Sequence, residues 1–414
     1  MSRVIALCFL LLAAVIGFLH IDSRPAWAPF AKNTVALAEE ELEVPAPSKS
    51  KNQIVPSKAS IPSPISTWLP ETAAPSVHAA SLIALKDGAI RAFWFAGSRE
   101  GAADVVINST IFDPKLSHWS APTVVMDRVS AEKGLSRYIA KLGNPVPARM
   151  ADGRLQLFFV TVSIGGWAGS SISSVISDDE GLTWGNPQRL IGSPLINLST
   201  LVKSPAIAFA DGRLGLPAYH EWIGRFGEFL RVDAGQVIDK RRMSSGRGAI
   251  QPLVFVNDDQ DATAYFRQTR GAGQAKQVPV SQTLNAGQSW QSDVDLPIAN
   301  PNSAVAGLRL NSGARILVLN NIEAGRYRLA LMMADAKSSQ WQVIEVVEDD
   351  EALSEQRKEF SYPYLISADG NDAHLVYTWD RKKIRHRYFS GAWLKRAQSQ
   401  LDTPPANVIS QEAK

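Results

Sequence analysis

Short apolar segments alternate with polar turns along most of this chain. In six places a short apolar strand leads into a Gly-, Asp- or Asn-containing turn, and a longer apolar segment follows. The second segments read AIRAFWF, RLQLFFV, RLGLPAY, ATAYF, ARILVLN and AHLVYTW. The turns before them contain Asp87, Asp152, Asp211, Asp258, Ser312 and Asp369. Such turns between β-rich segments are typical of β-hairpins.

The hairpins recur at intervals of about 50 to 65 residues, which indicates repeated structural units. Six four-stranded blades around one axis account for this spacing. A double-sheet sandwich also uses many short strands, but it would not repeat at this interval. We therefore predict an all-β fold, a six-bladed β-propeller, over residues 71–395. Helical periodicity is scarce outside a short segment near residues 131–137.

The N-terminus is a different kind of segment. After MSR comes the apolar run VIALCFLLLAAVIGFLHI, which predicts a helix. A cleaved signal peptide and a retained membrane anchor both fit residues 1–30, and Ala26-Trp27-Ala28 has the A-x-A form of a cleavage site. Either alternative places the rest of the chain in the periplasm or outside the cell.

Two further segments read as disordered. Residues 31–70 are rich in Ala, Pro, Ser, Lys and Glu, so they cannot bury enough apolar surface to offset their ordering entropy. We predict a linker there and a disordered tail at residues 396–414.

Composition excludes several classes of function. Lys and Arg number 43 against 40 Asp and Glu, with no long basic run, so nucleic acid is not an expected partner. The only cysteine, Cys8, lies in the N-terminal apolar run, which leaves no Cys-based zinc site or thiol nucleophile. The histidines are dispersed, and we expect neither a metal nor a cofactor.

The segment SDDEGLTW, residues 177–184, predicts a tight turn between two strands. Asp179 can accept backbone hydrogen bonds, Gly181 can adopt a positive φ, and Trp184 begins the next strand with a large aromatic. We interpret it as a folding device on the outer rim of a blade. Weaker copies end at Trp119, Trp290 and Trp341.

Candidate ligand-binding residues stand where each innermost strand begins, because these strands line the axis of a propeller and ligands bind at one end of it. A polar residue recurs beside a proline there, as in Asn144, Gln251, Tyr362 and Asn300, and the first blade has His78. The ends of the second strands add charged and polar groups: Arg99, Glu100, Tyr219, His220, Glu221, Arg267, Arg381 and Arg385.

These residue types suit an acidic sugar. The planar guanidinium of Arg makes two parallel hydrogen bonds to a carboxylate. Glycoside cleavage uses two carboxyl groups or a Tyr nucleophile activated by Glu. Candidates are Glu100, Asp104, Glu221, Tyr219 and Tyr362, with His78 or His220 for proton transfer. A His or Tyr base with an Arg would instead suit elimination at a uronic acid.

The chain resembles the bacterial exo-sialidase-like proteins of the sialidase (neuraminidase) superfamily, in the branch with BNR/Asp-box repeats. The resemblance covers residues 77–389. It is carried by the Asp-box at residues 177–184 and by the segments HAASLIALKDG, WFAGSREGAADVVI, LPAYHE, IQP, LPIANPNSAV, FSYPYL and HLVYTWDRKKIRH. It implies a six-bladed propeller with a glycan site at the centre of one face.

In sialidases three arginines bind the substrate carboxylate, an Asp is the acid/base, and a Tyr–Glu pair is the nucleophile. The resemblance therefore implies an arginine cluster drawn from Arg267, Arg328 and Arg381 or Arg385, with Tyr362 as nucleophile and Glu221 as its partner. One departure is that His78 stands in the region where the family has its first Arg, so a uronic acid fits as well as sialic acid.

We thus expect an exported glycoside hydrolase that acts on an acidic sugar of a glycan or exopolysaccharide. Arg99, Arg267 and Arg381 would hold the substrate, and Glu100, Asp104 or His78 would donate the proton. A non-catalytic glycan-binding propeller and a polysaccharide lyase on the same fold are the alternatives, and a membrane tether through the N-terminal segment fits each of them.

Overall fold

A computed structural model describes residues 2–22, 26–31, 64–114, 116–193, 197–246, 248–271, 273–336, 338, 340–350 and 356–401. The first element is an apolar helix, α1 (Ser2–Asp22), as predicted. Within the described part of the chain, no helix has the length and apolar character needed to cross a membrane.

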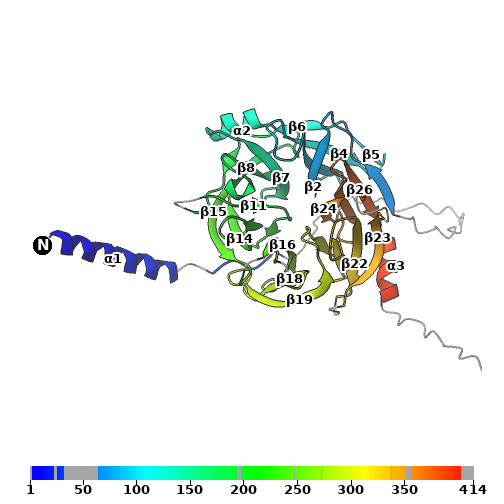
Figure 1. Cartoon of the computed structure of the whole chain (residues 1–414). Helices are drawn as coiled ribbons and strands as arrows, with labels where there is room; N and C mark the ends of the chain where they lie inside the picture. The colour runs from blue at the N-terminus through cyan, green and yellow to red at the C-terminus, as the bar shows by residue number, and fades with distance from the viewer. Residues whose placement is uncertain are drawn as a thin grey trace, which may run out of the picture.

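The remaining described residues form six antiparallel sheets arranged around one axis, which confirms the predicted six-bladed propeller (Figure 1). Blade 1 contains β2 (Ser76–Ala84), β3 (Ile90–Gly97), β4 (Val106–Asp113), β5 (His118–Trp119) and β6 (Thr123–Met126). Blade 2 contains β7 (Lys141–Arg149), β8 (Leu155–Val162), β9 (Ser170–Ser177) and β10 (Gln188–Arg189). Blade 3 contains β11 (Leu201–Val202), β12 (Ile207–Ala208), β13 (Leu214–His220), β14 (Phe226–Asp233) and β15 (Gln236–Arg242).

Blade 4 contains β16 (Ala249–Val256), β17 (Ala262–Gln268), β18 (Gln277–Thr283) and β19 (Gln291–Ala299). Blade 5 contains β20 (Ala306–Arg309), β21 (Arg315–Leu319), β22 (Arg328–Ala334) and β23 (Gln342–Asp349). Blade 6 contains β24 (Phe360–Ile366), β25 (Ala373–Trp379) and β26 (Lys383–Phe389). Neighbouring innermost strands contact one another around the axis, as β2 does with β7 and β24, and β20 with β16 and β24.

The core lies between adjacent blades. Every residue of β3 and of β8 is buried, because a second strand is covered on both faces by neighbouring sheets. The helix α2 (Arg128–Leu135) overlaps the helical segment expected near residues 131–137, and the Asp127 side chain accepts a hydrogen bond from the Ser130 N–H at its N-terminus.

The ring is closed by a strand that lies within the predicted linker. β1 (Ile65–Trp68) pairs with β26, with Ile65 opposite Tyr388, and so becomes the outermost strand of blade 6. This pairing covers the exposed edge of β26. The linker predicted at residues 31–70 therefore gives way to the propeller by residue 65, and its residues 32–63 lie outside the described residues.

The C-terminal boundary also differs from the prediction. A helix, α3 (Gly391–Leu401), continues past residue 395, because Leu394 and Ala397 are buried and Leu394 joins the apolar core of blades 5 and 6. Residues 402–414 of the predicted tail lie outside the described residues.

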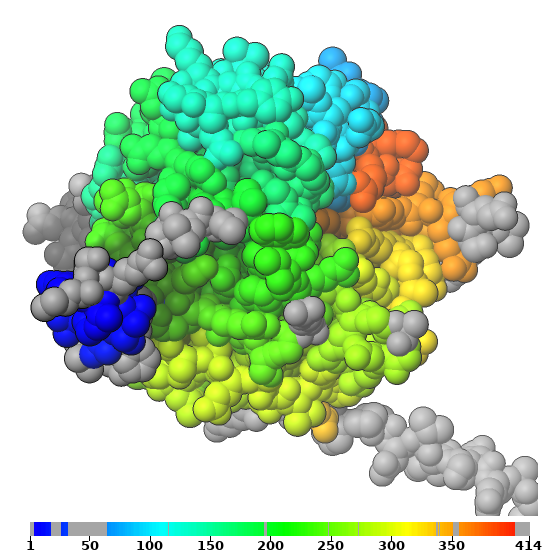
Figure 2. Space-filling model, turned by 60° about the vertical axis from the view of Figure 1, so that its left-hand side comes forward, coloured from blue at the N-terminus to red at the C-terminus, as the bar shows by residue number. Residues whose placement is uncertain are grey.

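Residues 26–31, which the sequence assigned to the N-terminal segment and linker, pack onto blades 3 and 4. Trp27 and Phe30 are buried against Phe209 and Phe229, and Phe30 forms a β-bridge with Phe209. Figure 2 shows the surface of the propeller on the side of blades 2 to 4, which run from cyan-green to yellow. The A-x-A sequence is thus part of the packed structure.

The Asp-box turn has the predicted form. Ser177 Oγ accepts the Gly181 N–H at 2.8 Å, and Asp179 accepts the Thr183 N–H at 2.8 Å. Hydrogen bonds from Thr183 lower the pKa of Asp179 to about 2. The copy that ends at Trp290 repeats the pattern, because Thr283 Oγ1 accepts the Gly287 N–H at 2.9 Å.

Candidate functional site

The same β-bulge occurs in four of the innermost strands. The register shifts after His78, Gly143, Ile250 and Ser361, and the residues that follow, Ala79, Asn144, Gln251 and Tyr362, have φ values of 52°, 44°, 51° and 52°. A bulge of this kind re-aims a side chain, and a left-handed φ in a non-glycine residue costs of order 1–3 kcal/mol. Three of these four residues precede a proline, which is the pattern that the sequence singled out.

These bulges bring Asn144, Gln251 and Tyr362 together near the axis. Gln251 Nε2 donates to the hydroxyl oxygens of Tyr362 and Tyr219, both at 3.2 Å. Asn144 Nδ2 lies 3.4 Å from the Tyr219 hydroxyl and donates to the Val202 carbonyl at 3.1 Å. Burial raises the pKa of Tyr219 well above its usual value, so Tyr219 is protonated over the working range of pH.

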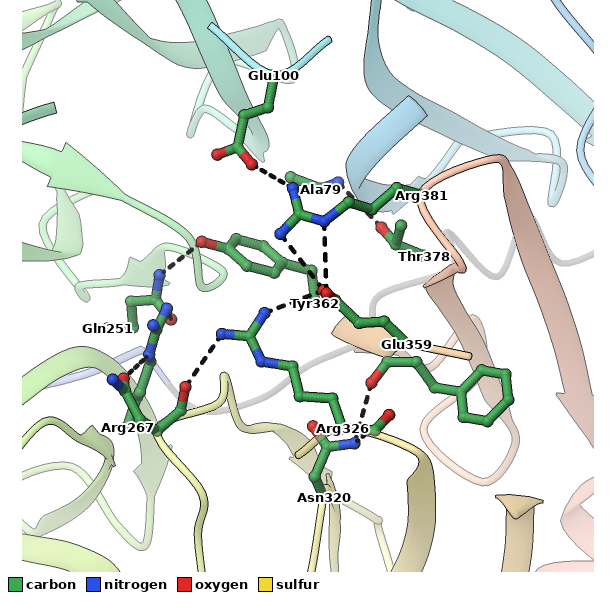
Figure 3. Close-up of polar contacts among 12 residues, drawn as sticks. Ala79, Glu100, Gln251, Arg267, Asn320, Arg326, Glu359, Tyr362, Thr378 and Arg381 are labelled. Atoms are coloured by element: carbon green, nitrogen blue, oxygen red, sulfur yellow. Dashed lines mark hydrogen bonds and ion pairs between the residues drawn. The ribbon is translucent and has the colours of Figure 1, made fainter. Parts of the chain in front are cut away.

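Three arginines surround Tyr362 (Figure 3). Arg267 comes from the end of β17, Arg326 from the loop between β21 and β22, and Arg381 from the turn between β25 and β26. Glu359 accepts hydrogen bonds from Arg326 at 3.0 Å and from Arg381 at 3.4 Å, and Glu100 accepts one from Arg381. We call Glu100, Gln251, Arg267, Arg326, Glu359, Tyr362 and Arg381 the central cluster.

Arg267 differs from the other two arginines of the central cluster. Its Nε donates to Asn302 Oδ1 at 2.7 Å, and its Nη1 donates to Gln251 Oε1 at 3.4 Å. Both partners are neutral, and Arg267 forms no ion pair with any described carboxylate. Its contact with Gln251 Oε1 also orients the amide, so that the NH₂ group faces the two tyrosine hydroxyls.

The two carboxylates of the central cluster, Glu100 and Glu359, form ion pairs with arginines. Burial would raise the pKa of Glu359, but the nearby Ser361 hydroxyl and the charges of Arg326 and Arg381 outweigh burial and lower this pKa. Glu359 is therefore ionised at neutral pH and offsets part of the positive charge of the cluster.

His78 packs directly against Tyr362. The two ring centroids are 4.3 Å apart, and Phe95 meets the imidazole edge-on at 5.7 Å. The His78 side chain is 1% exposed, and neither ring nitrogen has a hydrogen-bond partner among the described residues. Burial lowers the pKa of His78 to about 4, while the charge of Glu100 raises this pKa and the charge of Arg381 lowers it. The ring is therefore neutral at pH 7.

Glu221 lies beside the cluster, at the end of β13. Burial raises the pKa of Glu221, against the charges of Arg267 and Arg225. Its backbone N–H donates to Ser199 Oγ at 2.8 Å, which fixes the start of the following loop. The described contacts of the Tyr362 hydroxyl include Gln251 and do not include Glu221.

A buried lysine contacts the backbone next to Tyr362. Lys203, just after β11, is 5% exposed, and its Nζ donates to the carbonyl oxygens of Val305 at 2.9 Å and Pro363 at 2.6 Å. Burial lowers the pKa of Lys203 to about 7. The contact joins blade 3 to blades 5 and 6 and holds the backbone next to Tyr362.

Several predicted site residues have other contacts. Asp104 accepts hydrogen bonds from the N–H and hydroxyl of Ser98, both at 2.9 Å, within the loop that contains Arg99 and Glu100. Arg328 pairs with Asp349 on β23, and Arg385 bonds to Ser66 on β1. Asn300 is fully buried and bonds to the Ser303 carbonyl at 3.0 Å. His220 stacks on Phe226 with centroids 4.9 Å apart.

Three residues of the site, Arg326, Glu359 and Lys203, are not among those predicted from the sequence. A signal for Arg326 was present, because it lies in the same type of loop, between second and third strands, as Glu100 and Arg381. Glu359 precedes Tyr362 by three residues but carries no motif. Across the described residues, no group of three or more His, Cys, Asp or Glu side chains is arranged to hold a metal ion.

The profile of the BNR repeat-like domain family matches residues 88–375. No curated protein matches the sequence. Among solved structures, a Hadza microbial sialidase aligns with a TM-score of 0.62 at 13% identity, over 77% of this chain and 66% of that one.

The NanB sialidase of Streptococcus pneumoniae gives 0.61 at 11% identity, over 77% of this chain and 68% of that one. The leech intramolecular trans-sialidase aligns with a TM-score of 0.61 at 13% identity, over 79% of this chain and 69% of that one. At these identities the structural likeness shows the fold. The chain belongs to the BNR repeat-like domain family, and its six-bladed propeller fold is similar to that of sialidases.

Proposed function

We propose that the central cluster binds a carboxylate-bearing sugar and that the protein is a glycoside hydrolase of sialidase type. The observation that carries the proposal is Arg267, whose guanidinium has only neutral partners among the described residues. A carboxylate there would gain charge-assisted, bidentate hydrogen bonds. Arg326 and Arg381, 21% and 40% exposed, are open to the same ligand but already share Glu359.

Tyr362 is the proposed nucleophile. Its oxygen would attack the anomeric carbon and form a glycosyl–tyrosine intermediate, while the phenolic proton passes to the neutral His78 ring beside it. The amide of Gln251 donates to the same oxygen, and a donor to the charged form favours the phenolate. In the second step, water attacks the anomeric carbon and the bond from this carbon to the Tyr362 oxygen breaks. The His78 imidazolium then returns its proton to the phenolate, which restores both side chains.

Glu221 is the proposed general acid. Its raised pKa keeps the carboxyl protonated to a higher pH than an ordinary glutamate, which suits proton donation to the departing glycosidic oxygen. Its carboxylate would then accept the proton of the attacking water. Glu100 and Glu359 are ion-paired with arginines and are better suited to hold those arginines in place.

The test is hydrolysis of methylumbelliferyl glycosides of N-acetylneuraminic acid and glucuronic acid by the purified full chain. Tyr362→Phe is expected to lower kcat by about 100-fold or more while an acidic sugar still binds. Tyr138→Phe, at an exposed tyrosine, is the matched control and should leave the rate unchanged. An active enzyme whose rate is unaffected by Tyr362→Phe would rule out this assignment.

A non-catalytic glycan-binding propeller is the second candidate. The observation that favours it is the hydrogen bond from the Gln251 amide to the Tyr362 hydroxyl. A carboxylate at this position could accept the phenolic proton, whereas an amide cannot. In that case the wild-type protein binds an acidic glycan without cutting it, and Arg267→Gln abolishes binding while Tyr362→Phe does not.

We further propose that the protein is exported. Arg3 followed by a long apolar run is the support for this. Fractionation of cells that express the full chain, with a periplasmic and a cytoplasmic marker protein as references, tests it. Recovery with the cytoplasmic marker alone would contradict export.

A further inference from the structure

The loop between β13 and β14 borders the central cluster. Strands alternate in direction within every blade, so the loops between second and third strands all lie at one end of the propeller. In blades 1, 5 and 6 these loops supply Glu100, Arg326 and Arg381. In blade 3 the corresponding loop is residues 221–225. The charge of Arg267 acts on its first residue, Glu221, and lowers the pKa of that carboxyl against the effect of burial.

Hydrogen bonds hold this loop in one conformation. Ser199 Oγ accepts the N–H groups of both Glu221 and Trp222, at 2.8 Å and 2.9 Å. The N–H of Ile223 donates to His220 Nε2 at 3.2 Å, and the His220 ring stacks on Phe226. Three successive backbone N–H groups are thus satisfied by two side chains, one of which, Ser199, is fully buried.

This fixed loop presents apolar side chains to solvent. Trp222 is 50% exposed and Ile223 is 65% exposed. All eleven tryptophans lie in the described residues, and Trp68 is the only other one more than a third exposed. Arg385 lies over the Trp68 ring at 4.3 Å, whereas Trp222 has no aromatic or cationic ring contact within the described part of the chain.

The residues around Trp222 indicate which class of ligand this side chain could bind. A large aromatic side chain that is half exposed on a fixed support leaves one face of its ring available to a ligand. Here the apolar area is small, one indole and one isoleucine, and polar and charged groups flank it. A pyranose ring matches that arrangement, because its C–H face is apolar while its hydroxyl groups remain in water. An indole likewise combines a large apolar face with a polar N–H.

We propose that Trp222, supported by Ile223, is a stacking platform for the sugar next to the anionic residue, so that the site takes a glycan of at least two sugars. This rests on the proposed function, in which the anionic sugar lies on the central cluster. Glu221 then stands between the two sugar positions, which is where a proton donor to the connecting glycosidic oxygen belongs.

The experiment compares a single acidic sugar with a longer glycan. Binding of N-acetylneuraminic acid, glucuronic acid, sialyllactose and a glucuronate-terminated disaccharide is measured by calorimetry on the full chain, in a Tyr362→Phe background that prevents cleavage. Trp222→Ala is expected to weaken binding of the longer glycan of the preferred acid by about tenfold and to leave the single sugar unchanged. Trp222→Phe should retain most of the affinity, and Trp68→Ala should change neither.

The outcomes separate the two proposals. If Trp222→Ala leaves the longer glycan unchanged, or weakens the single sugar and the longer glycan equally, the stacking platform is wrong while the anion site stands. If the parent protein binds none of the four probes, the proposed function fails and the platform fails with it. Because Trp222 is exposed, thermal unfolding of Trp222→Ala should match that of the parent, which excludes misfolding as the cause of a loss.

Discussion

At the scale of single residues, His78 and Gln251 set the character of the central cluster. Each contacts Tyr362, and each is neutral at pH 7, His78 because burial lowers its pKa and Gln251 because it is an amide. The positive charge of the cluster therefore comes from Arg267, Arg326 and Arg381. Glu359 and Glu100 offset part of that charge, so the remaining positive charge matches the single carboxylate of the proposed ligand.

His78 makes the folded protein sensitive to acid. Its pKa of about 4 in the folded state is below the ordinary value of 6.5, so between these values the unfolded chain binds a proton that the folded chain does not. Stability is therefore expected to fall as the pH drops from 6.5 to 4, by up to roughly 3 kcal/mol from this residue. His78→Phe keeps a ring against Tyr362 and should remove that part of the pH dependence.

Urea unfolding of the full chain at pH 7 and at pH 4.5 measures this effect. The buried His386 also has a lowered pKa, so the informative quantity is the difference between variant and wild type. His118→Asn, at an exposed histidine, is the control and should keep the wild-type pH dependence. An identical pH dependence in His78→Phe would show that His78 titrates normally in the folded protein.

The sequence identified those site residues that have a local signal. Gln251 and Tyr362 stand beside prolines, and Glu100 and Arg381 follow apolar strands, so pattern and topology were enough to find them. Arg328 and Arg326 are two residues apart, and only the course of the loop decides which reaches Glu359. Lys203 and Glu359 could not be recognised, because their partners come from other blades or from loops without a motif.

At the scale of elements, the bulges in the innermost strands link fold to site. A regular strand would alternate its side chains across the sheet, whereas the left-handed residue in each bulge turns Asn144, Gln251 or Tyr362 toward the axis. The sequence predicted the strands and the recurring proline but not the bulge itself, because positive φ in Asn, Gln or Tyr carries no sequence signature comparable to that of glycine.

The Asp-box turn is expected to matter for stability and not for binding. Ser177 is buried, and its Oγ bonds to Asp179 and to the N–H of Gly181. Ser177→Ala leaves that N–H without its partner and should lower the free energy of unfolding by about 1–2 kcal/mol. The turn joins β9 to β10 on the outer part of blade 2, far from Tyr362 in the topology, so affinity for an acidic sugar should not change.

Urea unfolding and calorimetry on the same samples check both halves of this prediction. Asp178→Ala removes the neighbouring, exposed side chain, which has one long contact to Arg154, and serves as the matched control. A loss of sugar affinity in Ser177→Ala at unchanged stability would place the Asp-box in the binding site.

At the scale of the whole molecule, contacts between distant segments hold the ring together. β1 closes blade 6, and Lys203 crosses from blade 3 to carbonyl groups of blades 5 and 6. The repeat interval was enough to predict six blades, but ring closure could not be predicted, because β1 lies in a stretch whose composition resembles the linker. Pairing with a partner more than 300 residues away decided its structure.

The segment 26–31 is expected to be an integral part of the propeller. Trp27 Nε1 donates to Asp239 at 3.0 Å, Arg231 and Arg241 lie over the indole, and the Phe30 N–H donates to the Asp259 carbonyl at 2.8 Å. Trp27→Ala leaves a cavity beside Phe209 and Phe229 and should lower the free energy of unfolding by about 3–5 kcal/mol.

Processing after Ala28 would remove Trp27 and should destabilise the propeller in the same way. A chain that begins at residue 26 should therefore unfold at the same urea concentration as the full chain, whereas a chain that begins at residue 32 should unfold earlier. Trp68→Ala, at an indole on the outer strand of blade 6 that is 37% exposed, should cost less than Trp27→Ala. Equal stability of the chains that begin at residues 26 and 32 would mean that the segment only lies on the surface, and residues 1–30 would then be free to act as a cleaved leader.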